Sequence, residues 1–232
     1  MKRLLVLTFA ALLLWQGAAA EKYITLYTHG PEDAARVAIT VDDWWEPERL
    51  QEFLDAAKEY GAKLTLYPVG EILAEKDAAL WQRAVAEGHE IGNHTNTHKD
   101  LSKATRDSIL KQLGNFEKNL RAVLGEDYQV NTLRFPFGAG RHSGTKSAFA
   151  KAVSDAGYIH VALWDIDTTD PDKIMRKVHN GAIILLHGNK KDLKTLQNIL
   201  PRLKEAGYEA VTISQLLGLT KTQPAPASAN KQ

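Results

Sequence analysis

The chain of 232 residues contains no cysteine. Disulfide bonds, cysteine-ligated zinc and thiol catalysis are therefore excluded, and the fold must rest on its own hydrophobic core. A large excess of charge of either sign is also missing, since 29 Lys plus Arg are matched by 28 Asp plus Glu. Without a basic surplus, nothing in the sequence indicates a nucleic-acid partner.

Long apolar runs are scarce, and the longest lies near the start. Residues 4–15 are predominantly apolar, follow Lys2 and Arg3, and precede the small residues 17–20. This order is typical of a secretory signal, so we expect residues 1–20 to be removed on export to the periplasm or the cell exterior. The run is shorter than the roughly 20 residues of a membrane helix, and no cysteine is available for a lipid, so we expect no membrane anchor.

The remaining sequence predicts one α/β domain over residues 21–218 and a disordered Pro/Ala-rich tail over 219–232. Short β-rich runs alternate with segments of helical period, which indicates a parallel sheet or barrel with crossover helices. The seven expected strands are 37–41, 63–69, 90–94, 132–135, 158–163, 182–186 and 210–213, with 23–27 as an extra edge strand.

Three helices have clear boundaries in the sequence. Pro47 suits a first helical turn, and Gly61 suits the end of that helix. The longest helix should follow Thr105 and stop at Gly125, while Pro201 should kink the last long helix or start a second segment.

Polar residues gather where the expected strands end, which is where parallel β/α folds bind ligands. The polar residues at these ends are Asp42, Asp43, His94, Asp165, Asp167 and His187, and Phe137-Gly138 follow the fourth strand. Polar side chains scattered by chance would not prefer one end of the strands.

His94 and His98, with one carboxylate of the Asp42–Asp43 pair, have the composition of a metal site. Two imidazoles and a carboxylate leave coordination positions open, which is the catalytic pattern. The second carboxylate is then available as a general base. Alternatively, the two histidines share a solvated turn by chance and the two aspartates cap the helix near Pro47.

Arg134 and His187 are the other candidates. Arg134 ends a strand and can hold the Asp42 carboxylate, although a surface salt bridge is an equally ordinary role. His187 follows an apolar strand and can protonate a leaving group if Asp167 or Asp165 lies beside it, or else it is a buried core histidine.

Five ordered motifs resemble those of the polysaccharide deacetylase family, the NodB homology domain of carbohydrate esterase family four. The resemblance covers about residues 37–217 and rests on Thr40-Val-Asp-Asp43, His94-Thr-x-x-His98, Arg134-Phe-Pro-Phe-Gly138, Asp167-Thr-Thr-Asp170 and Leu185-Leu-His187. It implies a distorted (β/α) barrel with about seven parallel strands.

The resemblance also implies roles for individual residues. Asp43, His94 and His98 would bind a divalent metal, most often Zn²⁺, with Co²⁺ or Ni²⁺ as alternatives. The expected catalytic residues are Asp42 as base, Arg134 as its orienting partner, the Phe137 N–H as oxyanion donor, and His187 as acid tuned by Asp167. Leu185 would contact the acetyl methyl group.

The motifs depart from the family pattern at several positions. Trp44 and Trp45 stand where the family usually has Gly-Pro, and we expect these two indoles, with Trp164, to contact sugar rings. Pro171 stands where Trp is usual, and Asp165 offers a second carboxylate for His187.

The leading hypothesis is an exported, monomeric, metal-dependent enzyme that removes N-acetyl groups from an amino-sugar glycan. Peptidoglycan, chitin-like oligomers and exopolysaccharides are candidate substrates. The alternatives are an O-acetyl esterase on xylan or a similar sugar, a catalytically silent glycan-binding barrel, and a glycosidase using Asp165, Asp167 and Asp170. The glycosidase leaves the His94/His98 pair unexplained.

Overall fold

The computed structural model describes residues 23–219. The expected signal at 1–20 and all but the first residue of the expected tail lie outside this range. Within it, no helix combines the length and the apolar character that crossing a membrane requires.

The framework is a curved, entirely parallel sheet in the order β4-β3-β2-β7-β6, with β8 pairing beside the start of β2. A separate parallel pair, β1 with β5, is joined to it through Leu133, which bridges Asn93 on one side and Val161 on the other. The strands are β1 (Thr25–Tyr27), β2 (Arg36–Asp43), β3 (Leu64–Pro68), β4 (Glu90–Ile91), β5 (His160–Ala162), β6 (Ile166–Asp167), β7 (Ile183–His187) and β8 (Glu209–Val211). The predicted parallel α/β barrel, distorted by this weak link, is confirmed.

The prediction of a strand over residues 132–135 is wrong. Only Leu133 pairs there, because Pro136 and the left-handed backbone of Phe137 (φ 58°) end the extended segment. The expected strand at 210–213 begins one residue earlier and ends at Val211, and Ile213 already belongs to the short helix α7 (Ile213–Leu216).

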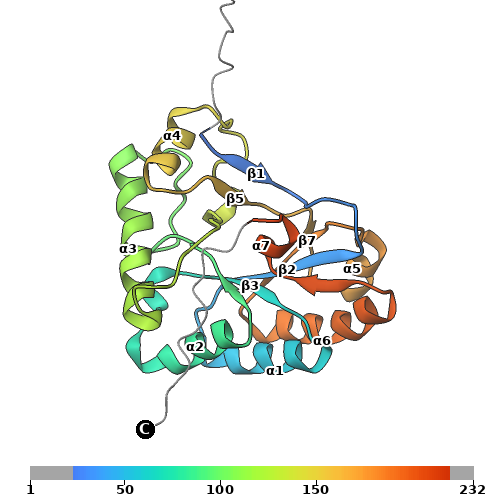
Figure 1. Ribbon diagram of the computed structural model, residues 1–232. Coiled ribbons are helices and arrows are strands. Elements are labelled where there is room, and N and C mark those ends of the chain that lie inside the picture. The colour runs from blue at the N-terminus through green and yellow to red at the C-terminus, as the bar shows by residue number, and fades with distance from the viewer. Residues whose placement is uncertain (1–22, 220–232) are drawn as a thin grey trace, which may run out of the picture.

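The other helices are α1 (Leu50–Tyr60), α2 (Ala78–Ala86), α3 (Arg106–Leu124), α4 (Ala148–Asp155), α5 (Pro171–Lys177) and α6 (Lys190–Glu205). Helices α1, α2 and α6 cover one side of the sheet, while β1 and β5 lie on the other, together with α4 (Figure 1). Gly61 ends α1 in a left-handed conformation with φ 71°, and Thr105 caps α3 through the Ser108 N–H, both as predicted. The last long helix runs through Pro201 as a single helix and is not divided there.

Strand β2 separates the core from the barrel interior. Its side chains alternate between the two faces, as they do in any extended strand. Val37, Ile39 and Val41 join the apolar cluster beneath α1 and α6. Thr40 and Asp42 are buried on the opposite face, which places the Asp42 carboxylate inside the barrel at the carboxyl end of the sheet.

The amino end of the barrel is closed by a hydrogen-bonded carboxylate. Glu90 is buried and accepts hydrogen bonds from the Thr65 hydroxyl, the Thr132 hydroxyl, and both the N–H and the hydroxyl of Ser214. The Tyr67 hydroxyl donates to Thr132, which extends this network towards the middle of the barrel. The buried Glu90 carboxylate therefore has hydrogen-bond partners for both oxygens, and we assign it a structural role.

Gly92 should tolerate no side chain, because a Cβ there would lie 2.2 Å from Cε1 of the buried Tyr67 ring. We predict that Gly92→Ala lowers the free energy of unfolding by about 1–3 kcal/mol through overpacking, measured by urea denaturation.

Gly114→Ala is the matched control. Gly114 lies in α3 with no atom within 4 Å of the added Cβ, so this change should raise the free energy of unfolding by about 0.5–1 kcal/mol. Equal effects of the two substitutions would contradict the packing described for Tyr67.

Candidate metal and catalytic site

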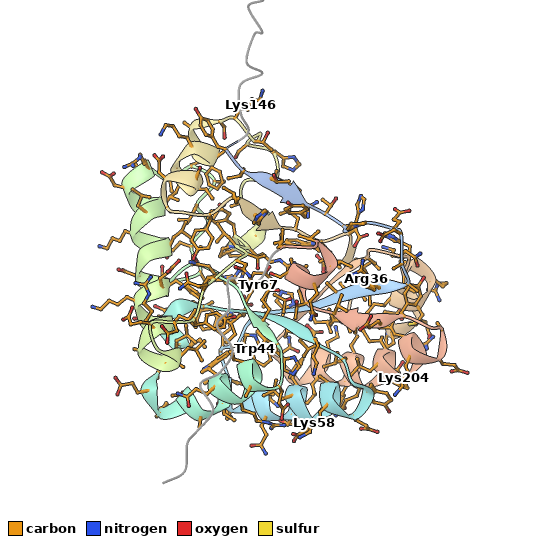
Figure 2. The ribbon with its side chains drawn as sticks, in the orientation of Figure 1. Arg36, Trp44, Lys58, Tyr67, Lys146 and Lys204 are labelled. Atoms are coloured by element: carbon orange, nitrogen blue, oxygen red, sulfur yellow. The ribbon has the colours of Figure 1, made fainter. Side chains whose placement is uncertain are left out.

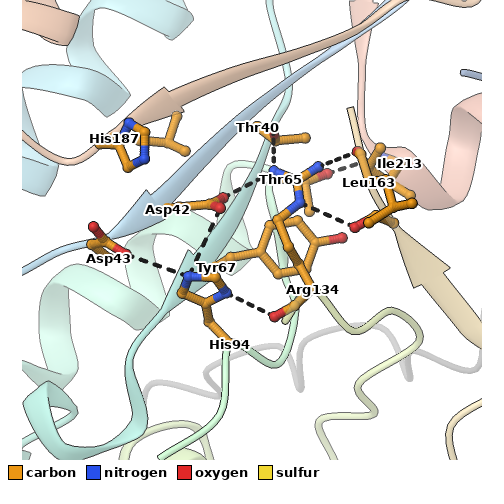
Figure 3. Close-up of polar contacts among 12 residues, drawn as sticks. Thr40, Asp42, Asp43, Thr65, Tyr67, His94, Arg134, Leu163, His187 and Ile213 are labelled. Atoms are coloured by element: carbon orange, nitrogen blue, oxygen red, sulfur yellow. Dashed lines mark hydrogen bonds and ion pairs between the residues drawn. The ribbon is translucent and has the colours of Figure 1, made fainter. Parts of the chain in front are cut away.

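Three side chains converge at the carboxyl end of the sheet. Asp43 ends β2, and His94 and His98 lie in the segment that follows β4. The Asp43 Oδ1 atom lies 3.3 Å from Nε2 of His94 and 3.0 Å from Nε2 of His98. One ligand atom from each residue falls within 4.8 Å of the other two, as expected for the ligands of one metal ion. Figure 3 shows Asp43 and His94 facing each other in this cluster.

The bonding of these atoms fits a divalent metal. Asp43 Oδ1 is buried and makes no hydrogen bond, although two imidazole nitrogens are close. His94 Nδ1 lies 2.7 Å from the Arg134 carbonyl oxygen, so Nδ1 carries the proton and Nε2 keeps its lone pair for a ligand. One carboxylate oxygen and two imidazole nitrogens suit zinc and similar ions. Burial alone would raise the pKa of Asp43, but the close imidazoles of His94 and His98 and their charge lower it.

The backbone around these ligands is strained. Within residues 23–219, each non-glycine residue with positive φ lies in a site motif or directly beside one: Asp43, Trp44, Thr95, His98 and Phe137. Such conformations persist only where the surroundings hold them.

Neighbouring side chains hold the histidine segment. Asn93 accepts a hydrogen bond from the Thr95 N–H at 2.8 Å. Gln112, on α3, accepts from the N–H groups of Asn96 and Thr97, both at 3.0 Å. The sequence analysis did not identify Asn93 or Gln112. Gln112 is distant in the chain from the histidines, and the sequence of its helix indicated only an apolar face packed on the core.

Asp42 belongs to a different cluster from its neighbour Asp43. Its Oδ1 accepts a hydrogen bond from Arg134 Nη1 at 2.9 Å, and the Arg134 side chain is fully buried. The Arg134–Asp42 ion pair is therefore buried, and the alternative of a surface salt bridge for Arg134 is wrong. The other oxygen, Oδ2, lies 3.8 Å from His94 Nε2 and faces the metal ligands.

Arg134 is itself held on every side. It donates to the Thr40 hydroxyl at 2.5 Å and to the carbonyl oxygens of Ala162 and Leu163 at 3.2 and 2.8 Å. Its guanidinium lies over the Tyr67 ring, 4.6 Å from the centroid. A buried guanidinium with this many partners is fixed in place, and it fixes the carboxylate that it orients.

His187 has a partner other than the one expected. Its Nδ1 lies 3.3 Å from Asp192 Oδ2, which also accepts the His187 N–H at 2.8 Å. The hydrogen bond with Asp192 raises the pKa of His187 against the opposing effect of burial, with further help from Asp42 and Asp43.

The predicted pairing of His187 with Asp167 or Asp165 is wrong. Asp167 is exposed at the pocket, and Asp165 instead binds His179 Nε2 at 2.6 Å and the Ile183 N–H at 2.9 Å. The reason is the short connection after β7: α6 begins only three residues after His187, so its first turn brings Asp192 under the ring. In the sequence, Asp192 five residues after His187 could have indicated this partner.

The two adjacent tryptophans point in different directions. Trp44 is fully buried, packs on Phe53 and Trp81, and donates from Nε1 to the Val41 carbonyl at 2.9 Å. Figure 2 shows it within the fold, so the prediction that Trp44 contacts sugar is wrong. Left-handed φ values of 74° at Asp43 and 66° at Trp44 turn this indole inward.

Trp45 is 52% exposed and contacts the edge of His98, with ring centroids 5.9 Å apart. Phe137, 72% exposed, contacts the same imidazole at 4.9 Å. The two exposed rings therefore both contact one metal-ligand candidate.

The convergent residues line a pocket of about 260 Å³. This is below the roughly 300–1,000 Å³ of pockets that enclose a whole small ligand, so it suits one part of a larger molecule. The lining residues are Asp42, Asp43, His94, His98, Phe135, Phe137, Trp164, Asp167, Leu185 and His187.

The partner of His187 can be tested directly. We predict that Asp192→Asn lowers the pKa of His187, because the charged acceptor is lost, and that Asp167→Asn has a smaller effect. The measurement is a pH titration of the His187 ring by NMR. A larger response to Asp167→Asn than to Asp192→Asn would contradict the assignment.

Comparison with known proteins agrees with this geometry. The sequence pattern of the family described as polysaccharide deacetylase matches residues 29–161. A peptidoglycan-N-acetylglucosamine deacetylase of Bacillus cereus is 29% identical over 215 residues, covering 87% of this chain and 74% of the relative. An uncharacterized Bacillus subtilis protein, YlxY, is 28% identical over 83% of this chain, which spans only 60% of that relative.

Solved structures show the same fold. The Bc1960 peptidoglycan N-acetylglucosamine deacetylase superposes with a TM-score of 0.73 at 29% identity, over 86% of this chain and 95% of that one. A wild-type pseudoenzyme of carbohydrate esterase family four from Bacillus anthracis gives a TM-score of 0.70 at 25% identity, over 83% and 68%. The family match spans more than half of the chain, and the fold and the candidate metal ligands agree with it: this protein belongs to the polysaccharide deacetylase family.

Proposed function

We propose that this protein is an exported, monomeric, metal-dependent deacetylase that hydrolyses N-acetyl groups of an amino-sugar glycan to a free amine and acetate. The observation that carries the proposal is the division between the two adjacent aspartates. Asp43 faces His94 and His98, whereas Asp42 is held apart by Arg134 with one oxygen directed at them. A metal set beside a separately oriented carboxylate is what hydrolysis by an activated water requires.

Asp43, His94 and His98 would hold the metal, most often Zn²⁺ in such a donor set, with Co²⁺ or Ni²⁺ as alternatives. When bound, the metal supplies Lewis acidity that polarises the acetyl carbonyl and makes water easier to deprotonate.

Asp42 then takes a proton from the water that attacks the acetyl carbon. The Phe137 N–H is proposed to donate to the oxyanion that develops on the acetyl oxygen. Leu185, which is 5% exposed in the pocket, would contact the acetyl methyl group.

His187 completes the reaction. It pairs in register with Asp42 across β2 and β7, so the two side chains flank the same site. The protonated His187 ring, supported by Asp192, donates its proton to the nitrogen as the carbon–nitrogen bond breaks. Acetate and the free amine are the products, and the proton taken by Asp42 balances the one given by His187.

The substrate class is inferred from the pocket and the relatives. The small pocket with an exposed aromatic rim suits one unit of a polymer. Relatives named as peptidoglycan-N-acetylglucosamine deacetylases support an acetylated amino sugar. The Bacillus anthracis pseudoenzyme shows that this fold also exists without activity, so a silent glycan-binding role is the competing proposal.

Acetate release tests the proposal. Metal-stripped and zinc-reloaded protein should be compared on chitin oligomers, peptidoglycan and acetylated xylan. We expect zinc-dependent release from N-acetylated substrates, and Asp42→Asn should lower kcat by about 10²–10⁴-fold because the general base is lost.

Zinc binding to Asp42→Asn, measured by calorimetry, is the control that separates base from ligand, and the variant should still bind one zinc ion. Release from xylan alone would indicate an O-acetyl esterase. No release from any substrate by protein that binds zinc would overturn the proposal in favour of the silent glycan-binding barrel.

A further inference from the structure

A basic loop follows the Phe137 turn, and its only charges are positive. Residues 139–147 contain Arg141, His142 and Lys146 and no acidic residue. The loop connects that turn to α4, so it begins at the pocket and leads away from it.

Arg141 is the member of this loop that reaches the pocket wall. Its guanidinium lies over the indole of Trp164, 4.9 Å from the ring centroid, and Trp164 lines the pocket. A Cβ placed on Gly138 would lie 3.3 Å from Trp164 Cη2 and 3.7 Å from Arg141 Nε, so both groups stand beside the turn that carries Phe137.

The Arg141 guanidinium is held in one orientation, but most of its N–H groups have no hydrogen-bond partner among the described residues. Its one side-chain hydrogen bond within residues 23–219 is a long contact, 3.4 Å, from Nη2 to the Trp164 carbonyl oxygen. None of the ion pairs in that range involves it, although Arg134 and most other arginines there have carboxylate partners. A cation held on an aromatic face keeps its planar donor groups in place at little entropic cost.

Trp164 is correspondingly unsuited to the sugar stacking expected of it. Both Arg141 and Arg134 lie over its ring, at 4.9 and 5.6 Å from the centroid. Two cations over the ring leave little free aromatic face for a sugar. Trp164 serves the pocket as a platform for Arg141.

We propose that Arg141 is a specificity-determining residue that binds a carboxylate of the substrate, and that the natural glycan is therefore acidic near the acetylated sugar. The inference rests on the proposed function of the neighbouring site. A planar guanidinium with unused N–H groups can donate two parallel hydrogen bonds to the oxygens of one carboxylate.

The surrounding charges favour a carboxylate over a phosphate. Asp167 is exposed at the same pocket, and its charge would repel a phosphate dianion more strongly than a carboxylate monoanion. One arginine at the rim matches one carboxylate. That carboxylate belongs either to an acidic substituent of an amino sugar or to a neighbouring uronic acid.

Binding measurements test this without depending on turnover. Zinc-loaded protein carrying Asp42→Asn is titrated with a neutral chitin tetrasaccharide, a peptidoglycan glycan strand with lactyl carboxylates, and a hyaluronan tetrasaccharide with uronic-acid carboxylates. We expect tighter binding of at least one acidic glycan than of chitin. Adding Arg141→Gln should weaken that preference by about tenfold or more.

Lys146→Gln is the matched control, because it removes a charge from the same loop without touching Trp164, and it should leave the preference unchanged. Arg141→Lys keeps the charge but not the planar fork, so it should recover only part of the preference. Whichever acidic glycan responds identifies the source of the carboxylate. No preference in the parent protein, or an equal loss with Lys146→Gln, would overturn the inference.

The two measurements distinguish a failure of this inference from a failure of the proposed activity. If no acetate is released but the Arg141-dependent preference is seen, the deacetylase proposal fails and the inference of an acidic glycan stands. Acetate release without that preference would do the reverse.

Discussion

The buried ion pair between Arg134 and Asp42 is the constraint on which the rest of the site depends. Removing one partner of such a pair leaves an uncompensated buried charge and costs about 3–5 kcal/mol. Arg134 also spans the weakest part of the barrel, since it bonds to Thr40 on β2 and to the carbonyl oxygens of Ala162 and Leu163 at the end of β5. Where Leu133 supplies only a one-residue bridge, this guanidinium adds a side-chain link between the two sheets and also orients Asp42.

The metal ligands are positioned by a second device, the buried indole of Trp44. Two successive left-handed residues, Asp43 and Trp44, turn the chain sharply at the end of β2. The packing of Trp44 against Phe53 and Trp81 offsets that strain. Glycine is required at position 188, because a Cβ on Gly188 would lie 2.7 Å from Trp44 Cε3. Trp44 thus fills the position that Gly usually takes in the family by anchoring the turn in the core.

The sequence was sufficient where function depends on strand ends. Asp42, Asp43, His94 and His187 all lie in one pocket, because parallel strands bring their carboxyl ends together. The sequence did not predict the direction in which a side chain points or contacts that depend on how closely two elements pack. Alternation in an extended strand cannot reveal that Trp44 turns inward, since the left-handed backbone is a property of the folded turn. The pairing of His187 with Asp192 depends on how tightly α6 follows β7, and the short pairing at Leu133 depends on where the turn at Pro136 begins.

The central claim is that two adjacent aspartates have separate tasks, Asp43 as a metal ligand and Asp42 as a carboxylate held by Arg134. A crystal structure of the zinc-loaded protein, with anomalous scattering measured at the zinc edge, tests it most directly. The account predicts one strong site with ligand distances of about 2.0–2.2 Å to Asp43, His94 and His98, and with Asp42 still bonded to Arg134. Zinc bound elsewhere, or Asp42 released from Arg134 to ligate the metal, would contradict it.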